Sequence, residues 1–182
     1  ALAQLEQWRA AGLELKVSVN IAARHLQRDD FVPRLRQMLA AHPELPLGES
    51  LELEVVESTA LEDITRIPRL IAECKELGVR FAIDDFGTGY SSLTYFKMLP
   101  AETLKIDQSF IRDMLKDPDD LAIIEGVIGL AEVFRRRVVA EGVESVAHGI
   151  ALLGLGCDLA QGHGIARPMP GDDFVAWVKD WR

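Results

Sequence analysis

The amino-acid sequence predicts an α/β fold built around a parallel β-sheet. Short apolar runs alternate with longer amphipathic segments, which gives six strand–helix units of roughly 30 residues each, the size of a βαβ repeat. Polar side chains fall where several of these runs end. The carboxyl ends of parallel strands carry the ligand site both in a (β/α)8 barrel and in an open doubly wound sheet. No glycine-rich phosphate loop follows the first strand, so the barrel is the favoured arrangement.

The length of the chain bears on how complete such a barrel is. A (β/α)8 barrel typically needs about 250 residues. This sequence has 182 residues and begins with a helical pattern rather than with a strand. We therefore expect a TIM-like (β/α)8 barrel that lacks about two N-terminal strand units and folds as a single domain over residues 1–182.

Each element is expected from its own pattern. Leu2, Leu5 and Trp8 share one helical face, and that first helix is expected to end near Gly12. Strands are expected where apolar residues run together or alternate with polar ones, at 15–21, 51–56, 79–83, 103–106, 138–140 and 157–160. Further helices are expected at 22–41, after 56 to about 77, at 93–98, after 106 to about 136, at 145–153 and at 172–181.

The composition excludes several classes of function. The net charge of −9 argues against a general nucleic-acid binder, which normally presents a basic face, and against adhesion to an anionic membrane. No run of 18 apolar residues and no signal-peptide pattern occurs, so we expect a soluble, cytoplasmic segment without membrane contact. The two cysteines, Cys74 and Cys157, lack metal-ligand spacing and are expected to be reduced, in apolar surroundings.

Two adjacent carboxylates, Asp84 and Asp85, follow the apolar run 79–83. A carboxylate at the end of a buried strand is costly to desolvate without a partner. A divalent cation is an effective partner, because one carboxylate can bridge two ions. The glycines and hydroxyl residues that come next suit a tight turn and a helix cap. The alternative interpretation is a strand end whose aspartates simply cap a turn.

Further polar residues occupy the other predicted strands. Glu54 lies inside a strand, where an inward carboxylate needs a partner, and Lys105 lies between two aliphatic residues. Plainer interpretations are Asn20 as a helix cap, Lys105 as a surface lysine and Glu141 as a turn cap. Carboxylate and amide oxygens suit Mg²⁺ or Mn²⁺, and two such ions about 3.5–4 Å apart can clamp the attacking and leaving oxygens of a phosphodiester. This hypothesis brings together Asn20, Glu54, Asp84, Asp85, Lys105, Glu141 and Gln161.

Six short motifs occur in order along the chain. They are Ser-Val-Asn at 18–20, Glu-Val-Val-Glu-Ser at 54–58, Asp-Asp-Phe-Gly-Thr-Gly-Tyr-Ser-Ser at 84–92, Leu-Lys-Ile-Asp at 104–107, Ala-Glu-Gly-Val-Glu at 140–144 and Gln-Gly at 161–162. In these motifs the chain resembles the EAL-domain family of cyclic di-GMP phosphodiesterases over essentially its whole length. The resemblance implies a modified (β/α)8 barrel that hydrolyses cyclic di-GMP to linear pGpG with two divalent ions, Mg²⁺ or Mn²⁺. It also implies a homodimer, with regulatory or diguanylate cyclase domains in a longer parent protein.

The same resemblance assigns roles to individual residues. Asp84 would bridge the two ions, the first held with Asn20 and Glu54 and the second with Asp85 and Glu141. The catalytic residues that it implies are Lys105, which would hold the nucleophilic water, together with Glu141, Asp85 and Gln161. Glu57 would anchor the loop that couples substrate binding to dimerisation. That loop comprises Phe86, Gly87, Thr88, Gly89, Tyr90, Ser91 and Ser92.

The sequence departs from the family pattern in three places. The Glu-Ala-Leu signature, whose glutamate is a ligand of the first ion, does not occur because the sequence starts after the place where it belongs, so three of the four expected ligands of that ion are present. Val56 stands where threonine is usual, and His163 stands where an aromatic residue usually follows Gln-Gly. The alternative function is therefore a catalytically impaired receptor that holds cyclic di-GMP, or a dimerisation module.

Overall fold

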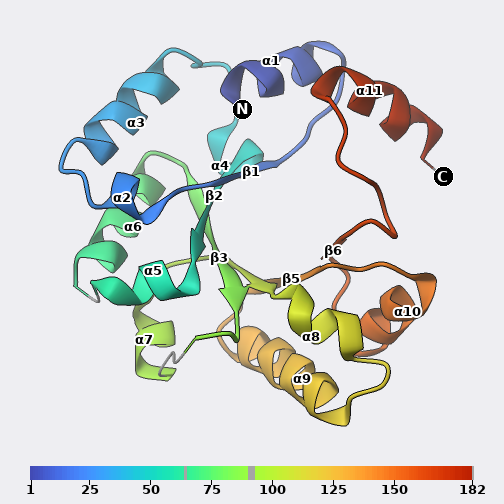
Figure 1. Ribbon diagram of the computed structural model, residues 1–182. Helices are drawn as coiled ribbons and strands as arrows, with labels where there is room; N and C mark the ends of the chain where they lie inside the picture. The colour runs from blue at the N-terminus through green and yellow to red at the C-terminus, as the bar shows by residue number, and fades with distance from the viewer. Residues whose placement is uncertain (64, 90–92, 182) are drawn as a thin grey trace.

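The computed structural model describes residues 1–63, 65–89 and 93–181. In this part of the chain the strands form one parallel sheet of six, in the order β1-β2-β3-β4-β5-β6, so each strand pairs with its neighbours in the sequence. The sheet curls into a partial (β/α) barrel with helices around its outside (Figure 1). The expected fold class is confirmed. The strands are β1 (Val17–Asn20), β2 (Leu51–Val56), β3 (Arg80–Phe86), β4 (Thr103–Ile106), β5 (Arg137–Glu141) and β6 (Ala160–Gln161).

The helices depart from expectation mainly by being shorter. The three long helices expected between strands are each divided in two, and a short helix before β2 was not expected. Pro118 explains one division, because proline fits the first turn of a helix, and Asp117 caps that turn by accepting a hydrogen bond from Asp119 N. The helices are α1 (Leu2–Ala10), α2 (Ala23–Leu26), α3 (Phe31–Ala40), α4 (Leu47–Ser50), α5 (Glu57–Glu62), α6 (Arg66–Glu76), α7 (Leu93–Met98), α8 (Gln108–Asp113), α9 (Pro118–Val133), α10 (Val146–Gly154) and α11 (Gly171–Asp180).

Strand β2 shows how the sequence separates core from site. Leu51, Leu53 and Val55 are buried in the hydrophobic core that the sheet shares with the surrounding helices. Glu52 and Glu54 alternate with them and point to the opposite face, where they meet Thr103 and Lys105 of β4 across the curled sheet. The face that the curled sheet encloses is therefore polar, and the apolar core lies outside it.

Strand β3 extends further than the apolar run predicts. We expected it to end at Ile83, but it continues through both aspartates to Phe86. Its register with β4 shifts between Ile83 and Phe86, and Asp85 has a φ of 53°, in the left-handed region that few residues other than glycine adopt. Successive side chains of a regular strand point to opposite faces. This irregularity therefore brings Asp85 to the same site as Asp84.

Strand β6 lies later than expected, at residues 160–161 rather than 157–160. Cys157 instead closes the end of α10, where its N–H donates to Leu152 O at 2.9 Å. Both cysteines are buried and free, as the sequence predicts.

The first and last helices lie side by side at the edge of the molecule (Figure 1). The rings of Trp8 in α1 and Phe174 in α11 are 5.2 Å apart, and Trp8 Nε1 donates to Gly171 O at 3.0 Å. Phe174 also stacks on Trp177 at 5.5 Å. Segments 163 residues apart in the sequence are thus held together by one indole ring.

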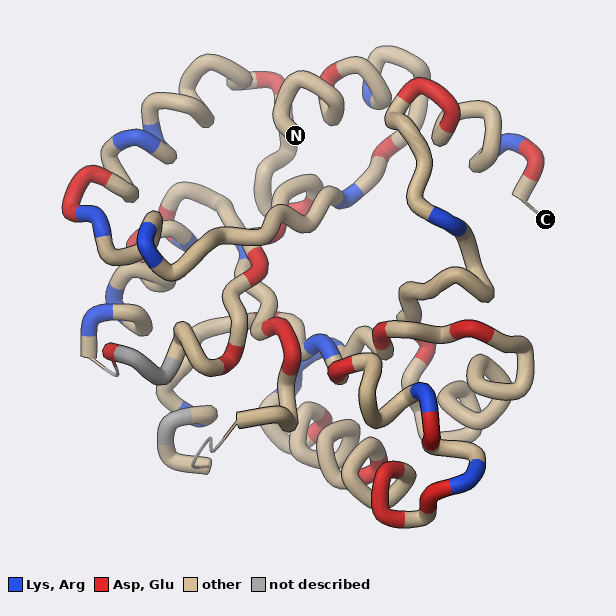
Figure 2. Tube along the Cα trace, in the orientation of Figure 1, with Lys and Arg blue, Asp and Glu red and all other residues tan. Residues whose placement is uncertain are grey.

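Charged residues are distributed over both the strands and the helices. Figure 2 shows acidic positions around the middle of the molecule as well as on the outer helices. Within residues 1–63, 65–89 and 93–181, no helix has the length and apolar character needed to span a bilayer.

Candidate active site

Lys105 lies at the centre of the polar inner face and is only 5% exposed. Its Nζ is 2.9 Å from Glu54 Oε1, 2.9 Å from Asp84 Oδ1 and 2.6 Å from Glu141 Oε1. These carboxylates come from β2, β3 and β5, so a single ammonium group joins four strands of the sheet. The interpretation of Lys105 as a surface lysine is therefore wrong.

The charges of this cluster do not balance. Burial alone would lower the pKa of Lys105, but its hydrogen bonds to Glu141, Glu54 and Asp84 outweigh burial, and the pKa is raised. Burial raises the pKa of Glu141, and the charges of Asp84 and Glu54 add to that rise, although Lys105 opposes it. Three carboxylates share one ammonium group, which leaves the site with a deficit of positive charge.

Three carboxylates are close enough to hold a cation. Asp84, Asp85 and Glu141 each offer an oxygen, and these oxygens all lie within 4.8 Å of one another. Asp84 Oδ1 is buried, and the ammonium group near it, Lys105 Nζ at 2.9 Å, is shared with Glu54 and Glu141. Carboxylate oxygens are ligands that Mg²⁺ and Mn²⁺ prefer. The set of oxygen donors and the deficit of positive charge around them both fit a divalent metal ion.

Asp107 belongs to this site although it was not among the individually predicted site residues. It is the N-cap of α8 and accepts a hydrogen bond from Ser109 N at 2.9 Å. Its carboxyl group is close enough to that of Asp85 to influence its pKa. Burial raises the pKa of Asp85, and the charges of Asp84 and Asp107 raise it further. The sequence held one indication of this position: Asp107 follows Lys105 by two residues, directly after β4, so both side chains lie near the carboxyl end of that strand.

Glu57 contacts the loop that follows β3. This carboxylate is 2% exposed at the start of α5, and its Oε2 accepts hydrogen bonds from Gly87 N at 3.0 Å and Gly89 N at 3.2 Å. A side chain at Gly89 would crowd the carboxylate, since a Cβ there would lie 3.0 Å from Glu57 Cδ. Glycine at this position permits the close approach. The remaining predicted loop residues, 90–92, lie outside the described residues.

The two amide residues sit at the ends of the sheet. Asn20 ends β1 opposite Glu54, and Gln161 ends β6 opposite Glu141. Helix α2 has Ala22 as its N-cap and no side-chain cap bond, so the interpretation of Asn20 as its cap is wrong. Glu141 and Gln161 both line a cavity of about 600 Å³, together with His163, residues 166–169 and side chains of α8 and α11.

These features define an α/β barrel-type domain with an acidic centre, able to hold a cation, at the carboxyl ends of its strands. The EAL-domain family model matches residues 1–168, and the chain belongs to the EAL-domain family.

Similar proteins have names that agree with this assignment. A cyclic di-GMP phosphodiesterase of Pseudomonas aeruginosa is 36% identical over 98% of this chain and 30% of its own length. The bifunctional diguanylate cyclase/cyclic di-GMP phosphodiesterase MucR of the same organism is 39% identical over 98% of this chain and 26% of its own length. A solved structure named as the PaMucR phosphodiesterase in complex with c-di-GMP has a TM-score of 0.90 and 39% identity, over 96% of this chain and 70% of that chain. The chain spans less than a third of either curated relative.

Proposed function

We propose that residues 1–182 form a single phosphodiesterase domain that hydrolyses cyclic di-GMP to linear pGpG. The observation that carries the proposal is the cluster of Lys105 with Glu54, Asp84 and Glu141, beside the three oxygens that fit a divalent cation. The names of the similar proteins support the choice of substrate. Cytoplasmic location and a second-messenger role belong to the same proposal.

The proposed metal ligands are two overlapping sets. Asn20, Glu54 and Asp84 would hold one ion, and Asp84 would share a second with Asp85 and Glu141. When bound, Mg²⁺ or Mn²⁺ would supply Lewis-acid polarisation of the phosphodiester and lower the pKa of an attacking water. The second set is supported by the spacing of its carboxylate oxygens, which all lie within 4.8 Å of one another.

Lys105 acts in this proposal as a cation and a hydrogen-bond donor. Its raised pKa keeps the amine protonated at neutral pH, so it does not serve as a general base. The ammonium group orients the attacking water and stabilises the charge that develops on the phosphate. Gln161, opposite Glu141 at the end of β6, orders the water or the substrate beside it.

Glu57 positions the loop over the site without touching the reacting atoms. Its two hydrogen bonds to the backbone of Gly87 and Gly89 hold the segment directly after Asp85. A homodimer, in which this loop would link substrate binding to pairing of two copies, belongs to the same proposal.

The test is hydrolysis of cyclic di-GMP with Mg²⁺ or Mn²⁺, with the products separated by chromatography. We expect linear pGpG from the wild-type chain and none above background from Asp84→Asn or in the presence of EDTA. A folded sample that binds the ions and yields no pGpG would contradict the proposed activity.

A receptor for cyclic di-GMP is the second candidate. Equilibrium binding of cyclic di-GMP in EDTA, without turnover after the ions are restored, would favour this candidate.

A further inference from the structure

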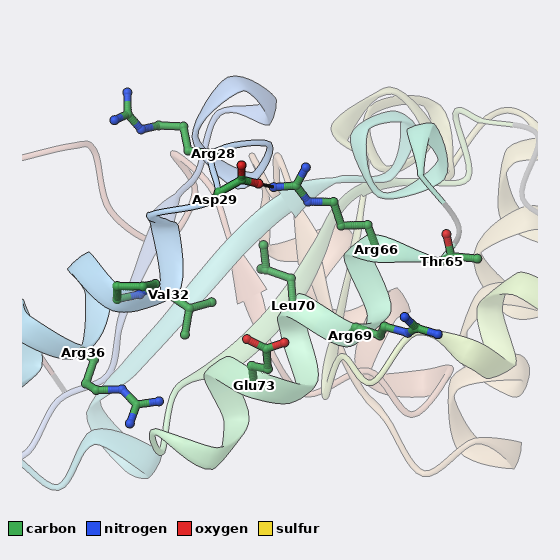
Figure 3. A pocket seen from close by; sticks show the side chains of 10 residues that line it. Arg28, Asp29, Val32, Arg36, Thr65, Arg66, Arg69, Leu70 and Glu73 are labelled. Carbon is green, nitrogen blue, oxygen red and sulfur yellow. Dashed lines mark hydrogen bonds and ion pairs between the residues drawn. The ribbon is translucent and has the colours of Figure 1, made fainter.

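A second cavity lies on the outside of the barrel, away from the carboxylate cluster. It has a volume of about 680 Å³ and is formed by α3, by α6 and by the segments that precede these helices (Figure 3). None of its lining residues takes part in the site around Lys105. The volume is within the range of small-molecule sites, roughly 300–1,000 Å³.

The charge of this cavity is opposite to that of the chain. Four arginines line it against two carboxylates, whereas the chain as a whole has a net charge of −9. Two of the arginines are already paired. Arg66 Nη2 lies 3.0 Å from Asp29 Oδ1, and Arg28 Nε lies 2.7 Å from Asp30 Oδ1.

The other two arginines have no such partners. Neither Arg36 of α3 nor Arg69 of α6 forms a hydrogen bond or ion pair with any residue that the structure describes. Glu73 is four positions after Arg69 on the same helix, a spacing that permits an ion pair, yet no such pair forms. Figure 3 shows the two guanidinium groups on different helices, with Leu70 and Glu73 on the surface between them.

The wall between these arginines is partly apolar. Leu70 is buried in the hydrophobic core and Val32 packs against that core, so both present carbon to the cavity. Arginine binds phosphate through two parallel hydrogen bonds, and a phosphate ester also carries a less polar body. Two unpaired arginines beside an aliphatic wall therefore match both parts of such a ligand.

We propose that this cavity binds a phosphate-bearing small molecule of nucleotide size. The positive charges of Arg36 and Arg69 attract the phosphate, and the body of the ligand contacts Val32 and Leu70. This site is separate from the phosphodiesterase centre, and its existence does not depend on the activity proposed above.

The test measures binding of two probes, GMP and inorganic pyrophosphate, by isothermal titration calorimetry in EDTA, which removes divalent ions from the carboxylate cluster. We expect one GMP per chain. The double variant Arg36→Gln/Arg69→Gln is expected to weaken GMP binding about tenfold or more, because both charge-assisted contacts are lost. Pyrophosphate lacks the body that contacts the aliphatic wall and is expected to bind more weakly than GMP.

The control variant is Arg34→Gln. Arg34 is also on α3 and exposed, but it does not line the cavity, so binding is expected to change less than twofold. Arg36 and Arg69 are exposed, and thermal melts should show all variants folded. Equal affinity for GMP in the wild type and the double variant, or no binding of either probe at millimolar concentration, would overturn the proposal.

Discussion

Glu52 and Glu54 lie two residues apart on β2, face the same interior and have opposite electrostatic surroundings. Glu52 Oε1 is 2.6 Å from Lys16 Nζ, while its Oε2 accepts a hydrogen bond from Thr103 Oγ1 at 2.7 Å and lies 3.2 Å from Arg137 Nη2. Glu54 shares Lys105 with two other carboxylates. One glutamate has a surplus of partners, and the other competes for a single cation.

This difference in partners distinguishes the Glu52 end of the barrel, where charges are balanced, from the Glu54 end, where negative charge is in excess. Burial raises the pKa of Glu52, but hydrogen bonds from Lys16 and Thr103 outweigh it, so the pKa is lowered and the carboxylate is stable as an anion. The cluster at the carboxyl ends keeps unmet negative charge, which a metal ion can satisfy. A buried carboxylate is therefore informative about function only when its partners have been counted.

Removing the ammonium group of Lys105 should produce the largest loss of stability. Lys105→Met leaves three buried carboxylates without their ammonium group, which is expected to cost about 3–5 kcal/mol in the free energy of unfolding in EDTA. Urea denaturation measures this loss. The carboxylates then take up protons more readily in the folded state than in the unfolded state, so stability should fall further as pH rises from about 5 to about 8. A loss that does not vary with pH would show that packing, not charge, is responsible.

A matched pair of variants tests whether only the Glu54 end of the barrel takes part in catalysis. Glu54→Gln is expected to lower kcat for cyclic di-GMP by about 10²–10³-fold, the cost of losing one electrostatic contact to the reacting groups. Glu52→Gln is expected to change kcat less than threefold. Both rates would be measured by chromatography at saturating Mg²⁺ or Mn²⁺, and equal losses in the two variants would remove the distinction.

In the free energy of unfolding the order should be reversed, with Glu52→Gln the more destabilising of the two variants. Glu52→Gln removes a charged acceptor from two cations and two hydroxyl groups, which is expected to cost about 1.5–3 kcal/mol in EDTA. Glu54→Gln relieves repulsion between carboxylates, so its free energy of unfolding should be closer to that of the wild type. Urea denaturation of both variants gives the comparison, and a less stable Glu54→Gln would contradict it.

The smallest effect is expected for the two cysteines on the outer, apolar face of the sheet, whose thiols should be unreactive in the folded protein. Burial, with a smaller contribution from Glu73, raises the pKa of Cys74 to about 12, and burial raises the pKa of Cys157 as well. Neither thiol should react with a disulfide reagent at pH 8 in the folded protein, because the thiolate is scarce and buried. Both should react after denaturation. Rapid labelling of the native chain would show that this face opens readily.

Much of the framework could be predicted from the pattern of residues. Strands β2 and β4 and helix α7 have the expected bounds, because apolar alternation and clear flanking residues mark them. The inward position of Glu54 and the burial of Lys105 also follow from their places in apolar runs.

Other features depend on tertiary geometry, which the pattern of apolar residues along the sequence does not predict. The irregularity at Asp85 follows from the register of two strands rather than from local sequence. The electrostatic coupling of Asp107 to Asp85 could not be predicted, because an aspartate before a helix is already explained as its cap. The partners of Glu52 come from three other segments that meet only in the folded sheet.

The contact between α1 and α11 has a dynamic consequence. No residue of α11 is fully buried, so its order depends on Trp8 and on the ring stack that begins at Phe174. The two helices should therefore detach as one cooperative unit at a lower free energy than the strands, and their amide protons should exchange with solvent deuterium together. A protein attached at either end of the chain could act on the barrel by favouring or resisting that local opening.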